Sequence, residues 1–120
     1  MQLDDNRPIW IQLVDSYRQR IATGTWPAGA KIPSVRELAL EGGVNPNTVQ
    51  RALAELDRAG LTRSERTTGR FVTADASTGP ATRTTLATEA TDAHIRTLRQ
   101  LGVDLTEATA LLAARWQAKE

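Results

Sequence analysis

The chain contains no cysteine and only one histidine in 120 residues. Without cysteine there is no disulfide and no thiolate metal site, which fits a reducing compartment, so we expect a cytoplasmic protein. His94 has no partner histidine or cysteine, and the sequence therefore predicts no metal and no cofactor. No nucleophile–base pair, carboxylate dyad or phosphate-binding glycine loop is recognisable either, so we do not expect an enzyme.

Long apolar runs are also missing. None approaches the roughly 20 residues of a membrane-spanning helix, so no membrane partner is expected. Residues 1–5 are acidic and lack an apolar core, which argues against a signal peptide. Hydrophobic residues make up 40% of the chain, enough for the core of one ordinary domain, or of a small domain with an appendage.

Charge of either sign is nearly balanced, with a formal net charge of +1. Residues 1–72 hold ten Lys or Arg and eight Asp or Glu, whereas residues 73–120 hold five and six. Because this bias is mild, any affinity for nucleic acid has to come from the local placement of arginines.

Near the N-terminus, apolar side chains recur at the spacing of one helix. Pro8 suits a first helical position and Gly24 is expected to end the helix. Turn-forming residues follow, and then Lys31-Ile32 could form a two-residue strand. The apolar stripe is predicted to pack into the core, and it consists of Trp10, Leu13, Val14, Tyr17 and Ile21.

Two short helices are predicted next, with a glycine turn between them. Ser34 and Glu37 form a capping box for a helix over residues 35–41. Gly42-Gly43 ends it, and at least one of these glycines is expected to have positive φ. Asn45 then caps a second helix, which has proline at its first position. This arrangement predicts a helix-turn-helix.

The outer face of the second helix is polar in its first turns. It presents Asn47, Thr48, Gln50 and Arg51, opposite an apolar face that is expected to be buried. In a helix-turn-helix this is where base edges in the major groove are read: Asn and Gln suit adenine, Arg suits guanine or phosphate, and Thr suits phosphate or a thymine methyl. No acidic residue occurs from Gly42 to Ala54, as a surface near phosphates requires. A solvated amphipathic helix is the alternative.

Arginines flank this helix on both sides. Arg36 lies in the first turn of the preceding helix, where it could hold a phosphate together with free backbone N–H groups, or could pair with a nearby acid. Residues 61–63 and 70–73 are predicted to form a hairpin around a turn, and it contains Arg63, Arg66 and Arg70. A basic hairpin tip can reach DNA backbone or minor groove. A plain solvated hairpin is the alternative.

Residues 8–72 closely resemble the winged helix-turn-helix of GntR-type bacterial transcription regulators. The residues that match are Pro8-Ile9-Trp10-Ile11-Gln12-Leu13, Ile21-Ala22-Thr23-Gly24, Pro27-Ala28-Gly29, Ile32-Pro33-Ser34-Val35-Arg36-Glu37-Leu38-Ala39, Gly43-Val44, Thr48-Val49, Arg51-Ala52-Leu53, Leu56, Gly60-Leu61 and Gly69-Arg70-Phe71-Val72.

The resemblance implies a mainly α fold with a small β wing (α+β), and a repressor that binds a palindromic operator in double-stranded DNA as a homodimer. It also implies DNA contacts at Arg36, Asn45, Asn47, Thr48, Gln50 and Gly69. Many members have arginine where this chain has Pro46 and Gln50, so their operator sequence does not transfer. The segment Asn45–Ala52 is similar to the YtrA-like branch, whose members are short and often regulate membrane-transporter operons. A winged helix used for protein–protein contact is the alternative.

The C-terminal part is expected to be an appendage to a DNA-binding domain of residues 1–73. Residues 74–84 are predicted to be a linker, and residues 85–120 two helices, one from Thr85 to Gln100 or Leu101 and one capped by Asp104 that ends near Ala118. The apolar residues expected at an interface are Leu98, Leu101, Leu105, Leu111, Leu112 and Trp116.

Two such helices cannot bury these faces on each other alone, so they must pack on the first domain or on a second chain. A 48-residue tail is too small for the ligand-binding domain of larger GntR-like proteins, and the YtrA-like resemblance implies a two-helix dimerisation tail. We therefore expect a homodimer interface. The sequence indicates no pocket for a small-molecule effector.

Overall fold

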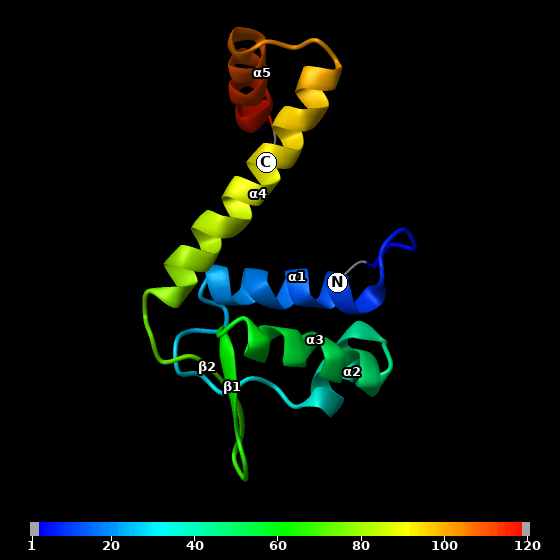
Figure 1. Cartoon of the computed structure of the whole chain (residues 1–120), viewed down its shortest axis with the longest axis vertical. Coiled ribbons are helices and arrows are strands. Elements are labelled where there is room, and N and C mark those ends of the chain that lie inside the picture. The colour runs from blue at the N-terminus through cyan, green and yellow to red at the C-terminus, as the bar shows by residue number, and fades with distance from the viewer. Residues whose placement is uncertain (1–2, 119–120) are drawn as a thin grey trace. The chain divides into compact units, whose positions relative to one another are not determined.

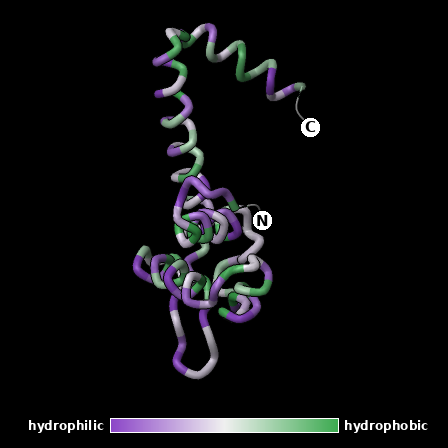
Figure 2. The backbone as a smooth tube through the Cα atoms, turned by 90° about the vertical axis from the view of Figure 1, so that its right-hand side faces the viewer, coloured by the Kyte–Doolittle hydropathy of each residue, from purple (hydrophilic) through white to green (hydrophobic). Residues whose placement is uncertain are grey.

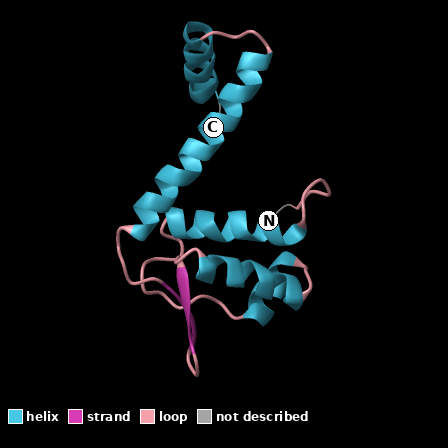
Figure 3. Ribbon diagram, in the orientation of Figure 1, coloured by secondary structure: helices cyan, strands magenta, loops and turns pink. Residues whose placement is uncertain are grey.

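A computed structural model describes residues 3–118 of the chain, which divide into two compact units with the boundary between Thr84 and Thr85. Within this range there are five helices and one two-stranded antiparallel sheet (Figure 3). The predicted fold class, mainly α with a small β wing, is confirmed. The elements in order are α1 (Ile9–Ala22), α2 (Val35–Gly42), α3 (Pro46–Arg58), β1 (Thr62–Glu65), β2 (Gly69–Val72), α4 (Thr78–Gln100) and α5 (Leu105–Ala118).

Helices α1, α2 and α3 of the first unit pack around one hydrophobic core, beside the β1–β2 hairpin (Figure 1). The stripe predicted on α1 lies in this core, except that Trp10 is only partly buried at its edge. The largest fully buried side chains are Tyr17, Leu13, Leu38, Leu53, Leu56, Val49 and Val72. Since they come from all three helices and β2, the wing and the helices belong to one packed body.

A buried glutamine ties the N-terminal segment to α1. Gln12 is 7% exposed, and its Nε2 donates to the carbonyl oxygens of Asp4 (2.7 Å) and Arg7 (2.8 Å) while its Oε1 accepts from the Asp4 N–H. These bonds satisfy a polar group on the buried face. Pro8, the predicted first helical residue, is instead the N-cap of α1, so the helix begins one position later, at Ile9.

Both predicted helix starts of the helix-turn-helix are confirmed. The Ser34 hydroxyl accepts from the Glu37 N–H (3.1 Å) and the Glu37 carboxylate accepts from the Ser34 N–H (2.9 Å), which completes the capping box. The same hydrogen bonds from Ser34 hold the pKa of Glu37 below its ordinary value. Gly43 adopts φ 63°, a left-handed conformation that few other residues adopt, and this allows α3 to begin three residues later, at Pro46.

The hairpin pairs Thr62 with Val72 and Glu65 with Gly69, around a turn of residues 66–68. The predicted two-residue strand is present as a single bridge between Lys31 and Phe71. Two backbone bonds of 2.9 Å flank it, from the Ile32 N–H to the Arg70 carbonyl and from the Val72 N–H to the Ala30 carbonyl. The segment before α2 is therefore held against β2.

Helix α4 begins at Thr78, not at Thr85, so residues 78–84 are helical where a linker was predicted. Pro80 had suggested a loop, but proline is tolerated in a first helical turn because the N–H groups there have no partner in the helix. Thr82 is buried, and a Cβ at Gly79 would lie 3.1 Å from the Ile21 carbonyl oxygen. The first turns of α4 thus pack against α1 within the first unit, which a mobile linker would not do.

In the second unit, the Asp104 carboxylate accepts from the Glu107 N–H (2.9 Å) and starts α5, as predicted. Hydrophobic residues recur along α5, coloured green in Figure 2. Over residues 3–118, none of the helices combines the length and hydropathy needed to cross a bilayer.

Among residues 3–118, Tyr17 is the core residue whose polar group lacks a partner. Its ring stacks on Trp26 with centroids 5.3 Å apart, and its buried phenolic oxygen makes no hydrogen bond within residues 3–118. Burial raises the pKa of Tyr17 to about 12, because the tyrosinate would lose its hydration.

Tyr17→Phe is therefore expected to leave the free energy of unfolding unchanged or to raise it by about 1 kcal/mol, because the ring is kept and an unsatisfied hydroxyl is removed. Tyr17→Ala, which also removes the ring, is expected to lower it by about 3–5 kcal/mol. Urea denaturation followed by circular dichroism measures both values. A clear loss of stability in Tyr17→Phe would show that the hydroxyl is bonded.

Candidate nucleic-acid interface

The buried face of α3 sets which residues the helix presents outward. Val49, Ala52, Leu53 and Leu56 are all in the core, so the opposite face points to solvent. Asn47, Gln50 and Arg51 are exposed and Thr48 is half-buried. The structure therefore brings the predicted cluster together on one outer face of the first turns.

Asn45 has a structural function at the start of this helix. Its side-chain oxygen accepts from the Asn47 N–H (2.7 Å), and its carbonyl accepts from the Thr48 N–H (2.9 Å). The cap satisfies one backbone donor that has no partner in the helix. The side-chain nitrogen of Asn45 has no hydrogen-bond acceptor among residues 3–118, so it can donate to another group.

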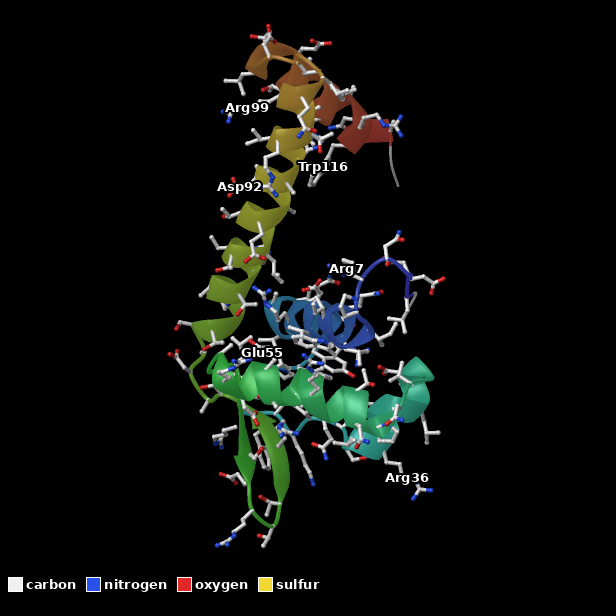
Figure 4. All side chains as sticks on the ribbon, turned by 45° about the vertical axis from the view of Figure 1, so that its right-hand side comes forward. Arg7, Arg36, Glu55, Asp92, Arg99 and Trp116 are labelled. Atoms are coloured by element: carbon white, nitrogen blue, oxygen red, sulfur yellow. The ribbon has the colours of Figure 1, made fainter. Side chains whose placement is uncertain are left out.

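Arg36 projects freely from the first turn of α2. It is exposed, it makes no ion pair or hydrogen bond with residues 3–118, and Figure 4 shows it extending away from the helices. Pairing with Glu37, the alternative from the sequence, does not occur; the Glu37 carboxylate accepts from the Ser34 N–H instead. Arg36 is thus free to hold a phosphate.

Arg51 lies over an aromatic ring of α1. Its guanidinium carbon is 4.1 Å from the centroid of the Trp10 ring, a cation–π distance. The stacking leaves the positive charge unneutralised but fixes where it lies. Arg51 is therefore oriented by α1, which the sequence pattern of α3 could not show.

The wing arginines differ in their surroundings. Arg70 is bound to Asp57 at the end of α3, from Nε (3.2 Å) and Nη2 (3.1 Å), and its side chain is only 19% exposed. The same carboxylate accepts from the hydroxyls of Thr62 and Ser64. Asp57 thus anchors both strands of the wing to α3. Arg66, in the turn, is exposed and makes no ion pair with any residue between 3 and 118.

An open groove of about 790 Å³ lies between the start of α2, α3 and the wing. Of the predicted contact residues it includes Gln50, Gly69 and Arg70, while Arg36, Asn47 and Arg66 lie outside it. Glycine is favoured at position 69 because φ there is +116°, a conformation that other residues rarely adopt; a Cβ would also come within 2.9 Å of Cε of the flexible Lys31 side chain, which would have to shift. Gly69 therefore has a structural reason to be glycine, independent of any DNA contact.

Sequence reasoning missed Lys31 and Asp57 as residues of this site. The predicted strand at Lys31-Ile32 was a usable signal, since pairing with the hairpin puts Lys31 at the wing. The sequence carries no such signal for Asp57, because its partner Arg70 is 13 residues away and no local spacing links the two residues.

A capped helix pair with an exposed polar second helix, followed by a two-stranded hairpin, defines a winged helix-turn-helix protein of the DNA-binding class. Residues 12–72 match the family described as bacterial regulatory proteins, gntR family. The chain belongs to the GntR family, and it is a DNA-binding transcriptional regulator.

Known relatives agree with this assignment. The chain is 31% identical to the uncharacterized HTH-type transcriptional regulator YhcF of Bacillus subtilis. The alignment spans 106 residues and covers 88% of each protein. It is also 36% identical to the HTH-type transcriptional repressor YtrA of the same organism. That alignment spans 80 residues and covers 65% of this chain and 62% of YtrA. The predicted YtrA-like resemblance is confirmed.

Solved structures are similar too. A GntR family transcriptional regulator from Listeria monocytogenes superposes with a TM-score of 0.89 at 36% identity, covering 93% of this chain and 98% of that one. The AraR DNA-binding domain in complex with operator ORR3 superposes with a TM-score of 0.55 at 28% identity, and the match covers 60% of this chain and 87% of that one. The winged-helix part of this chain thus shares its fold with a domain that has been solved on operator DNA.

Proposed function

We propose that the protein is a repressor that binds a palindromic operator as a homodimer. The observation that carries the proposal is a set of large apolar side chains left exposed at the end of α4 and along α5. Their exposed fractions are Leu101 71%, Leu105 81%, Leu111 47%, Leu112 51% and Trp116 75%. Large exposed apolar side chains close together in the sequence indicate a protein–protein interface. Leu98, also predicted at the interface, is only 9% exposed and packs within its own chain.

A second copy of the chain is the occupant we propose for this face. Closed dimers use the same patch on both subunits, and a two-fold protein dimer fits a two-fold DNA site. The name of the similar YtrA, a transcriptional repressor, supports the direction of regulation. A repressor acts where the chromosome lies, so we expect the cytoplasm.

In this proposal the DNA contacts divide by chemistry. Asn47 and Gln50 read base edges in the major groove, with Arg51 held beside them by Trp10. Arg36, Thr48 and the turn of the wing with Arg66 hold phosphates, and Asn45 and Gly69 set the local backbone. We propose residues 1–73 as the DNA-binding domain and residues 85–120 as the dimerisation region.

Operator binding is tested by fluorescence anisotropy on the promoter DNA next to the protein's own gene, titrated with salt. We expect a complex that weakens steeply as salt rises, and a footprint with two symmetric half-sites, because bound phosphates release counterions. Absence of a salt-sensitive complex would favour the alternative of a winged helix that binds another protein.

A further inference from the structure

Two cations line the groove between α2 and the wing, Lys31 and Arg70, and only one of them is neutralised. Arg70 is bound to the carboxylate of Asp57 through Nε and Nη2. Lys31 is exposed and forms no ion pair with any residue in the range 3–118. Of the two, Lys31 is the cation that this groove offers to an anionic partner.

The backbone at Lys31 is held in place like that of a strand. Lys31 bridges to Phe71, and hydrogen bonds on either side join Ile32 to Arg70 and Ala30 to Val72. The lysine stem lies against Gly69, since a Cβ there would be 2.9 Å from Cε and 3.7 Å from Nζ. The wing thus directs the stem, so less freedom is lost when the ammonium binds.

Two carboxylates border the same groove, Glu37 and Glu65, and each already has a partner. Glu37 accepts from the Ser34 N–H, and Glu65 lies 3.6 Å from the Arg63 guanidinium. Neither forms an ion pair with Lys31, although Lys31 helps to lower the pKa of Glu37 as the weakest of its causes. The ammonium keeps its three donors for another ligand.

We propose that Lys31 binds a phosphate of the operator backbone, at the junction of recognition helix and wing, and that Arg70 positions the wing instead of touching DNA. The inference rests on the proposed operator binding. A lysine ammonium is a point charge, which suits a phosphate and does not read a base edge as a guanidinium does. Lys31 therefore adds affinity without adding sequence preference.

The experiment compares salt titrations of operator binding by the wild type, Lys31→Gln, Lys31→Arg and Arg7→Gln. Each phosphate contact contributes about 0.9 to the slope of log K against log salt. Lys31→Gln is expected to lower the slope by about 0.9 per bound protomer and to weaken operator and mismatched DNA by the same factor. Lys31→Arg keeps the charge and should restore the slope.

Arg7→Gln is the matched control, because it removes one positive charge from the same unit at the start of α1, away from the wing (Figure 4). It should leave the slope unchanged. If the wild type binds the operator and Lys31→Gln has the same slope of log K against log salt, the phosphate contact of Lys31 is overturned while operator binding stands. A loss in Lys31→Arg equal to that in Lys31→Gln would also overturn it, since distortion of the wing would then explain both. No salt-sensitive binding by the wild type would overturn this inference together with operator binding.

Discussion

Leu112→Glu with Trp116→Glu is expected to convert the protein to a monomer and to lower its affinity for a two-half-site operator by about 100-fold or more. Both side chains are exposed on the chain by itself, so the substitutions do not open its core. In a dimer they would bury unpaired carboxylates, which is strongly unfavourable. Loss of the dimer removes the gain from binding two linked half-sites, which is typically about 10²–10⁴.

Light scattering measures the oligomeric state, and anisotropy measures binding to the full operator and to a single half-site. Binding to the half-site should change little, because the recognition helices are untouched. Ala110→Glu with Ala114→Glu is the matched control: it adds two charges at the same spacing on the opposite side of α5, at 100° per residue. A dimer that persists in the Leu112 and Trp116 variant would show that the interface lies elsewhere.

Gln50→Ala is expected to weaken operator binding by about 1–3 kcal/mol and to relax the preference at one base pair in each half-site. The Gln50 side chain is exposed, lines the groove and makes no hydrogen bond within residues 3–118, so its amide is free to pair with an adenine edge. Removing the amide costs affinity only where the correct base is present.

The measurement compares the wild type and Gln50→Ala on operators that carry each of the four bases at every half-site position. Gln19→Ala, an exposed glutamine on α1, is the matched control and should change neither affinity nor preference. Equal weakening at all positions would assign Gln50 to the DNA backbone rather than to a base.

Most of the fold could be predicted because its signals are short-range. The capping box of Ser34 and Glu37, the Asn45 cap and the Asp104 cap each join residues within three positions, and all are present. The apolar spacing of α1 and α3 likewise predicted which faces are buried. Pro80 is the counterexample, since its local chemistry permits both a loop and a first helical turn.

The site was predicted only in part, because the sequence shows which side chains are charged but not which of them are paired with an opposite charge. Arg36 and Arg70 are both arginines near the recognition helix, yet one is free and the other is bound to Asp57. Leu98 has the same helical spacing as the other apolar residues of the tail, but it is buried within its own chain. Neither difference has a signature in local sequence.

By itself, the sequence determined the helix-turn-helix, its caps, the wing and the polar residues on the outer face of α3, because periodicity and capping act over one or two helical turns. Only the tertiary structure decided that Asp57 holds Arg70, that Trp10 orients Arg51 and that Gly69 makes room for Lys31. These pairs join elements far apart in the chain. The core of α1, α3 and β2 is what holds those elements together.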